Sequence, residues 1–448
     1  MSFRFPSFLR SHLFSPQIIF AVSLLFLLIR NIPLCFILPI WAHGDEIGHI
    51  DYILKIGRGH IPQPRDHIES SLFLFHKTRW DSRIIAPGGN FRIKKIKELG
   101  LAGYSYEAHH PPFPYFLLAL CRRVFFLHEL PFLLQVRIFR LLCLFMITIG
   151  MAFIYFAWRH HQVNDLLFYF PLLLISLLSQ DMFAAINTDN FSFFCGSIAC
   201  AGLIYITFKP SMLKGWILLA VGTILALWTK ISNIYFFGFW IIPFLAYRKH
   251  HQRKLIFSYA FIFLLLALII SSPWYIYNFI RFSSPISDLS LPYPLIPPQG
   301  VSFTSLKNFS LAFSRTLFRG EFFWEGRYLD IICGRFNPLF YGILLIFILY
   351  GLIRIRLKYI FNSLPLFNSA LYFPSLVFVA FFLICCLKGG FPLYHARFSF
   401  GELYFIMLLF FSGWKMLLCS THLAGITTAL LLFFYNLLYT INLIFLVR

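Results

Sequence analysis

The chain alternates long apolar runs with short polar breaks along its whole length. Most of the runs contain roughly 17–25 residues, which is the length that an α-helix needs to cross about 30 Å of hydrocarbon. They lie near residues 18–40, 113–121, 132–157, 166–179, 190–208, 213–228, 233–247, 255–280, 337–353, 368–387, 398–418 and 423–447. Continuous apolar runs of this kind exclude the alternating strands of an outer-membrane barrel. The pattern predicts an all-α fold, a polytopic transmembrane helical bundle of about 11–13 spans.

The composition is that of a membrane protein, and the location of the basic residues accounts for the strong positive charge. The chain has 448 residues, of which 59% are hydrophobic and 12% charged, far from the balance of a soluble domain. The net charge of +21 comes largely from short loops such as 248–254 and 354–358, and basic loops of this kind are typical of a cytoplasmic face. We therefore expect contact with membrane lipids and no nucleic-acid partner.

The whole chain, residues 1–448, is predicted to be one integral membrane domain with two substantial outer loops, 41–110 and 281–336. The 41–110 loop contains eight of the 17 acidic residues, which indicates that it faces water. An uncleaved first span with a cytoplasmic start places this loop outside. Three apolar runs separate this loop from the turn before residue 190, and three crossings would place that turn inside. The turn should also be outside, so we expect that one of the three runs does not cross the membrane. The short 113–121 run is the first candidate.

Two adjacent acids, Asp45 and Glu46, follow the first apolar run, and His49 lies one helical turn beyond Asp45 on the same face. A carboxylate at the boundary between membrane and water can act as a general base toward an attacking hydroxyl. Solvated loop charge or capping of a helix N-terminus is the alternative interpretation. Asp45 and Glu46 are thus the candidate catalytic residues, with His49 beside them.

The other end of the same loop also carries ionisable groups, namely Glu107, His109 and His110. They directly precede a proline-rich helix start, which places them at the same predicted depth as Asp45. An ordinary interfacial anchor of aromatic and histidine residues is the alternative. Asp45, Glu107 and His109 include ligand types that suit a divalent metal, but their spacing matches no specific metal pattern, so no cofactor is assigned.

Three further charged residues lie at other predicted outer turns: Asp189, Lys230 and Arg397. Lysine and arginine at this depth suit a phosphate, because lysine acts as a point charge and arginine can bind two oxygens. Capping is the alternative for Asp189, and pairing with lipid headgroups is the alternative for the two cations. The sequence thus predicts Glu107, His109, His110, Asp189, Lys230 and Arg397 as substrate-binding candidates together with His49.

The order of these short motifs resembles that of bacterial membrane glycosyltransferases of the GT-C superfamily, especially the protein-mannosyltransferase-like and aminoarabinose-transferase-like groups. The matching positions, in chain order, are Asp45-Glu46-x-x-His49, Gly57 or Gly59 to Pro62, Glu107-x-His109-x-Pro111-Pro112, Asn187-x-Asp189-Asn190, Thr229-Lys230 and the Pro273–Asn278 stretch. The resemblance covers the chain to about residue 285. This chain differs by a basic insertion between Asp66 and Gly103, and it lacks the large soluble outer domain of the oligosaccharyltransferase-type relatives.

The resemblance implies a polyprenyl-phosphate sugar as donor and an acid of the first outer loop as catalytic base. Asp45 would then deprotonate an acceptor hydroxyl, while Lys230 and Arg397 would bind the donor phosphate. The implied location is the bacterial inner membrane, with the active site on the periplasmic side. A transporter or flippase of lipid-linked sugars, and a non-catalytic protein of similar fold, are the alternative functions.

Overall fold

The computed structural model describes residues 15–38, 40, 46–63, 66–69, 71–72, 105–177, 180–247, 250–283, 401–418, 421, 423–427 and 430. Within these residues every regular element is a helix, which confirms the all-α prediction. The elements are α2 (Pro16–Ile37), α3 (Glu46–Gly57), η1 (Tyr106–His109), α6 (Phe113–Val124), η2 (Leu127–Glu129), α7 (Phe132–His160), η3 (Leu166–Phe168), α8 (Phe170–Ser176), α9 (Gln180–Phe183), α10 (Thr188–Phe208), α11 (Leu213–Leu227), η4 (Ile231–Phe236), α12 (Phe237–Ala246), α13 (Arg253–Phe282) and α18 (Leu403–Leu418). The second outer loop and the predicted spans at 337–353 and 368–387 lie outside the described residues.

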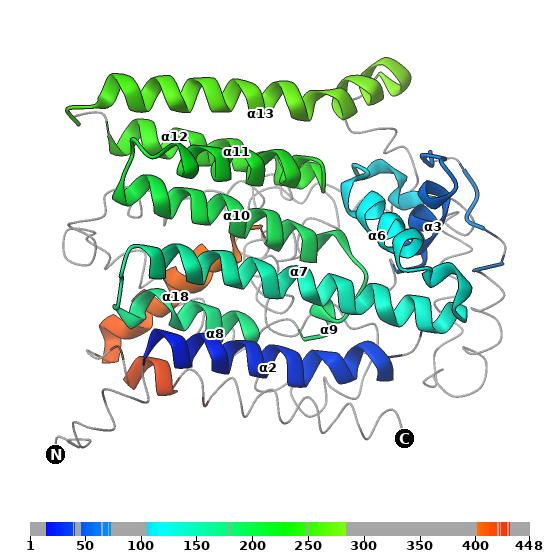
Figure 1. Ribbon diagram of the computed structural model, residues 1–448, viewed down its shortest axis with the longest axis horizontal. Coiled ribbons are helices and arrows are strands. Elements are labelled where there is room, and N and C mark those ends of the chain that lie inside the picture. The colour runs from blue at the N-terminus through cyan, green and yellow to red at the C-terminus, as the bar shows by residue number, and fades with distance from the viewer. Residues whose placement is uncertain are drawn as a thin grey trace, which may run out of the picture.

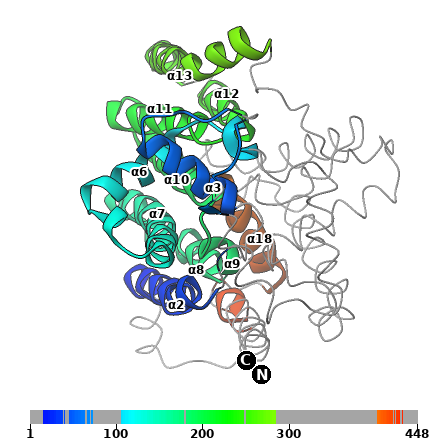
Figure 2. The same ribbon diagram turned by 90° about the vertical axis from the view of Figure 1, so that its right-hand side faces the viewer.

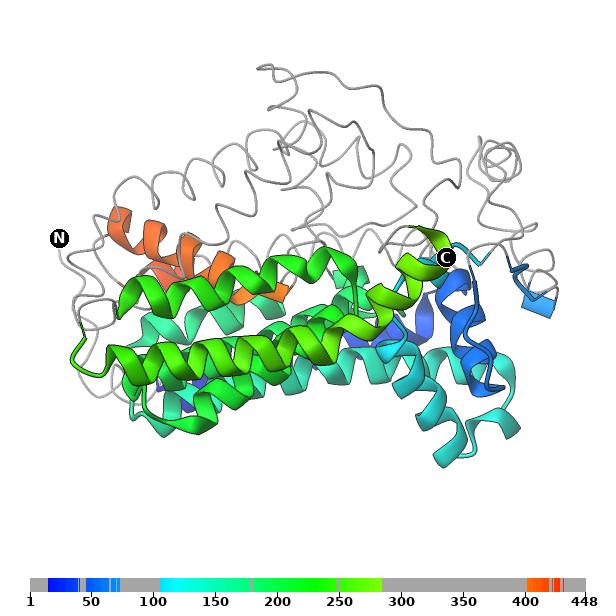
Figure 3. The same ribbon diagram turned by 90° about the horizontal axis from the view of Figure 1, so that it is seen from above.

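Four helices, α2, α7, α10 and α13, are long and apolar enough to cross a membrane. Figure 1 shows them side by side with α8, α11 and α12, while α3 and α6 lie together at one end. Figure 3 gives the same arrangement from above. The helical membrane protein is therefore supported, whereas the full span count and the GT-C fold remain predictions.

Helix α10 is the most buried of these four long helices. It packs against α7 on one side and α11 on the other, and nearly all of its residues are buried. Helix α13, by contrast, packs on α11 and α12 and exposes large apolar side chains along much of its length. A chain of this composition exposes such a face where lipid, rather than water, surrounds it.

Small residues allow α10 to approach its neighbours closely. A Cβ at Gly202 would collide with the backbone of α11, and a Cβ at Gly222 of α11 would collide with Ala199 of α10. On another face, Gly196 lies against the carbonyl oxygen of Gly401, directly before α18. Helix association in membranes uses such small residues because lipid supplies little hydrophobic driving force between helices.

Replacing Gly196 with alanine is expected to destabilise the protein by at least about 1–3 kcal/mol, because backbone must move to admit the methyl group. The measurement is thermal unfolding of the purified protein in detergent. Gly57→Ala is the matched control, since a Cβ there would meet only the Arg122 guanidinium, at 3.9 Å. Equal effects of the two substitutions would contradict this account of α10 packing.

Helix α6 does not have the length of a span. Its 12 residues extend about 18 Å, well short of the hydrocarbon thickness. It packs on α3 at the end of the bundle, as the view along the helices in Figure 2 also shows. The backbone N–H of Ile186 lies 3.5 Å from Glu46 Oε1, so the first loop and the turn before α10 meet at the same end. Between these two sites the chain therefore runs along the bundle twice, through α7 and then through the broken segment from η3 to α9.

Candidate functional site

Glu46, the first residue of α3, is held by a buried ion pair with Arg140 in the first third of α7. Arg140 Nε and Nη2 donate to the two carboxylate oxygens, each at 2.7 Å, and both residues are at most 1% exposed. Arg140 Nη1 also donates to the carbonyls of Leu38 at 2.7 Å and Cys35 at 3.3 Å. The last carbonyls of a helix lack partners within the helix, so this arginine completes the end of α2 while it fixes the start of α3.

The histidines and the acid at the two ends of the first loop lie together against α3. Glu107 Oε2 is 3.1 Å from His110 Nε2 and 3.6 Å from His49 Nδ1, and all three side chains are buried. His49 Nδ1 is also 2.9 Å from the hydroxyl of Tyr115 on α6. The structure thus brings His49, Glu107 and His110 together, as their common predicted depth suggested, although the chain separates them by about 60 residues.

Tyr52 strengthens this contact between α3 and the 107–110 segment. Its hydroxyl donates to the backbone carbonyl of His110 at 3.1 Å, and its ring stacks on Tyr115 with centroids 3.9 Å apart. Burial raises the pKa of Tyr52, and nearby Tyr277 raises it further, so the phenol remains a donor at neutral pH. His109 is half-buried, and its ring lies 3.9 Å from that of His110.

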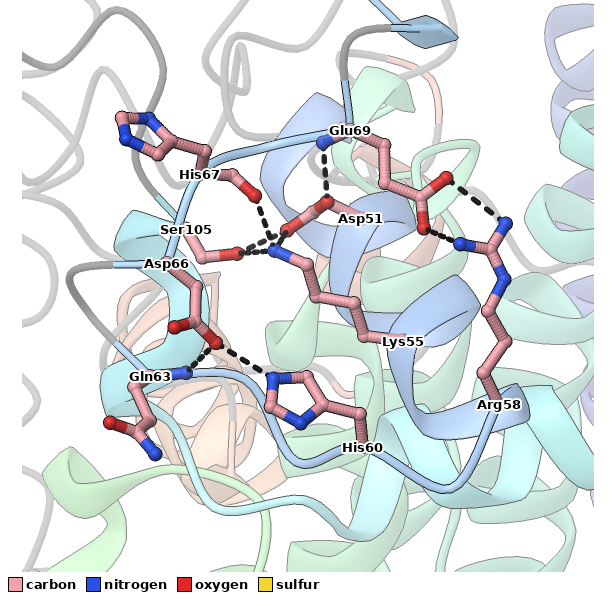
Figure 4. Close-up of polar contacts among 9 residues, drawn as sticks. All are labelled: Asp51, Lys55, Arg58, His60, Gln63, Asp66, His67, Glu69 and Ser105. Carbon is pink, nitrogen blue, oxygen red and sulfur yellow. Dashed lines mark hydrogen bonds and ion pairs between the residues drawn. The ribbon is translucent and has the colours of Figure 1, made fainter.

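Further along α3, Asp51 fastens the two segments that flank the basic insertion (Figure 4). Asp51 accepts hydrogen bonds from the backbone N–H of Glu69 at 3.0 Å and from the Ser105 hydroxyl, and it pairs with Lys55 at 2.8 Å. Lys55 also donates to the His67 carbonyl at 2.7 Å. Because Asp51 is fully buried and Lys55 nearly so, this network is an internal anchor rather than solvated loop charge.

Two exposed pairs complete the network drawn in Figure 4. Arg58 donates to both carboxylate oxygens of Glu69, at 2.6 and 3.2 Å, and His60 donates to Asp66 at 2.9 Å. Partial burial acts to raise the pKa of Asp66, but the hydrogen bonds from His60 and from the Gln63 backbone outweigh it and lower the pKa overall. Pairs this exposed contribute little stability, so they orient the loop more than they hold it.

Asp189 and Lys230, predicted as separate features, form one buried ion pair. Lys230 Nζ lies 2.7 Å from Asp189 Oδ1, and neither residue is more than 4% exposed. Asn187 caps α10 by accepting from the Asn190 backbone N–H at 2.8 Å, and this places Asp189 in the first turn. The capping alternative therefore holds for Asn187, whereas Asp189 neutralises the lysine charge.

The loop cluster and this ion pair adjoin one another. The Phe113 backbone N–H, three residues after His110, donates to the carbonyl of Trp228, two residues before Lys230, at 3.2 Å. Helix α13 supports the same junction, because the Trp228 indole donates to the Ile270 carbonyl at 3.0 Å and Tyr275 donates to Leu227 at 2.6 Å. Three motifs from distant parts of the sequence thus meet at one end of the bundle.

Pro273 explains how α13 reaches this junction. Proline has no backbone N–H, so the carbonyl of Ile269 loses its helical partner. The Ser272 hydroxyl donates to that carbonyl at 2.9 Å instead. Helices bend at such sites, and Figure 3 shows that the last turns of α13 leave the line of its earlier turns.

Asp45 and Arg397 lie outside the described residues, and their roles stay predictions. Among the residues that the structure covers, no group of three or more His, Cys, Asp and Glu side chains could hold a metal ion. Sequence reasoning missed Arg140, Asp51 and Glu402. Arg140 and Glu402 are charges within apolar runs, a pattern that marks functional or paired groups and could have identified them.

Comparisons with family models, with curated proteins and with solved structures find no match to this chain. The functional assignment therefore depends on the chemistry and the arrangement of these residues.

Proposed function

We propose that this chain is an integral membrane glycosyltransferase that moves a sugar from a polyprenyl-phosphate donor to an acceptor hydroxyl. The main support is the junction at Phe113 and Trp228, where the acid and histidines of the first loop adjoin the Asp189–Lys230 pair. An acid-rich loop next to a buried cation is suited to a reaction that takes a proton from one partner and leaves an anion on the other. The proposed location is the outer face of a bacterial inner membrane.

In the proposed reaction, the acceptor oxygen attacks the anomeric carbon of the sugar and forms the new glycosidic bond. The bond between that carbon and the phosphate oxygen breaks, and its electron pair leaves with the polyprenyl phosphate. Asp45 takes the acceptor proton, and Arg397 and Lys230 offset the charge of the leaving phosphate. Attack in line with the departing oxygen inverts the anomeric centre.

The geometry assigns a different part to Glu46. Arg140 binds both of its carboxylate oxygens, so Glu46 is suited to position the loop that carries Asp45 and not to accept a proton. Lys230 likewise has its charge balanced by Asp189 before any ligand binds. We therefore assign Lys230 to the late stage of the reaction, when charge on the leaving phosphate competes with Asp189 for the ammonium group.

The test is turnover of a polyprenyl-phosphate sugar by the purified protein, with Glu107→Gln compared with Glu129→Gln. Glu107 holds His49 and His110, so its loss should lower turnover about a hundredfold by misplacing groups around the acceptor. Glu129 is an exposed acid of η2 and serves as the matched control, with turnover like that of the wild type. Movement of lipid-linked sugar across vesicles without any glycosylated product would instead favour the transporter.

A further inference from the structure

Glu402 is a buried acid to which the proposed reaction gives no role. It lies directly before α18 and is 1% exposed. The preceding residue, Gly401, packs its carbonyl against Gly196 in the middle of α10. A Cβ at Gly401 would lie 2.6 Å from both the Phe236 ring and the Tyr235 hydroxyl, so η4 closes the other side. The segment that carries Glu402 is therefore packed against both α10 and η4 at the start of α18.

Neither carboxyl oxygen of Glu402 has a hydrogen-bond partner, although both are buried, and no ion pair to it occurs within the part of the chain that the structure describes. Phe236, which lies against the adjacent Gly401, and Leu403, the next residue along the chain, are fully buried apolar residues. Transfer of a carboxylate from water to such surroundings without compensation is so costly that the group takes up a proton instead.

Tyr235 of η4 is the titratable group that connects Glu402 with the charged groups of α10. Asp189 and Cys195 lie on α10, and Tyr235 of η4 is near enough to interact electrostatically with both Asp189 and Glu402. Lys230, at the start of η4, is bonded to Asp189 at 2.7 Å. An ionised Glu402 would therefore give the cluster around Tyr235 (Asp189, Lys230 and Glu402) two negative charges against one positive charge.

We propose that Glu402 carries a proton in the resting protein at neutral pH and forms a buried proton-binding site in the cluster around Tyr235. With Glu402 neutral, the charges of Asp189 and Lys230 cancel. Loss of the proton would give the cluster a net negative charge. One consequence rests on the proposed function, in which Lys230 binds the donor phosphate. Only the cluster with Glu402 protonated then accepts that anion without added repulsion.

Infrared spectroscopy of the purified protein at neutral pH tests the proton directly. The difference spectrum between wild type and Glu402→Gln should show the carbonyl band of a protonated carboxylic acid. Glu129→Gln, at an exposed position, should show carboxylate bands instead. Carboxylate bands for Glu402 would overturn the proposal. The measurement needs no donor and no acceptor, so its result is independent of the glycosyltransferase proposal.

A second measurement uses the wild type alone and applies even if Glu402→Gln fails to fold. A hydrophobic carbodiimide adds the O–H of a protonated carboxyl across one C=N bond, and the adduct rearranges to a stable N-acylurea. Mass spectrometry should find this label on Glu402 at neutral pH, with less label as the pH is raised, and little on Glu129. Absence of label on Glu402 at neutral pH would count against the bound proton.

Discussion

Replacing Arg140 with methionine is expected to lower the free energy of unfolding by about 3–5 kcal/mol. The substitution leaves the Glu46 carboxylate fully buried without the two bonds that now balance it. It also removes the donor to the Leu38 carbonyl at the end of α2. Breaking one side of a buried ion pair costs far more than the pair contributes, because the remaining buried charge loses its counter-ion.

Chemical or thermal unfolding in detergent measures this loss, and Arg123→Met at an exposed position of α6 is the matched control, expected to change stability little. The double variant Arg140→Met with Glu46→Gln should recover much of the loss, since no buried charge is left unpaired. A double variant as unstable as Arg140→Met alone would show that the arginine acts through the α2 carbonyls and not through Glu46.

Much of the helical architecture follows from composition and run length. The apolar runs at 190–208 and 255–280 correspond closely to α10 (Thr188–Phe208) and α13 (Arg253–Phe282). The run at 166–179 forms η3 and α8 with α9 beyond it, and the run at 233–247 begins within η4. Hydropathy shows that a segment is apolar, but the place where a helix breaks depends on local backbone partners that hydropathy does not report.

The site was only partly predictable for a related reason. The common depth of His49, Glu107 and His110 follows from span boundaries, because both ends of a loop return to the same side of the membrane. The pairing of Lys230 with Asp189 does not follow from span boundaries, because it depends on the register of α10 against α11. That register is set by close contacts such as Gly222 against Ala199, which a single sequence does not specify.

The same limit applies to the dipeptide Asp45-Glu46, whose two acids look alike in the sequence. Glu46 starts a helix and reaches Arg140, a residue 94 positions away, so its role depends on tertiary contact. Because Glu46 has this structural role, we expect substitution of Asp45 to affect the reaction more than substitution of Glu46.

Asp45→Asn is expected to lower turnover of the polyprenyl-phosphate sugar by about 10²–10⁴-fold, because asparagine cannot accept the acceptor proton. Glu46→Gln should differ in kind: it weakens the pair with Arg140 and lowers stability, with a smaller loss of turnover. Turnover and unfolding midpoints measured on the same preparations separate the two roles. Asp66→Asn, in the same loop and bonded to His60, is the control, with turnover near that of the wild type.

The comparison of Asp45→Asn with Glu46→Gln shows which of the two acids accepts the proton. If Asp45→Asn retains full turnover while Glu46→Gln abolishes it without loss of stability, Glu46 is the base and Arg140 holds it in its ionised form. If both retain full turnover, the proton goes to another group, and Glu107, with His49 and His110 on either side, is next by geometry.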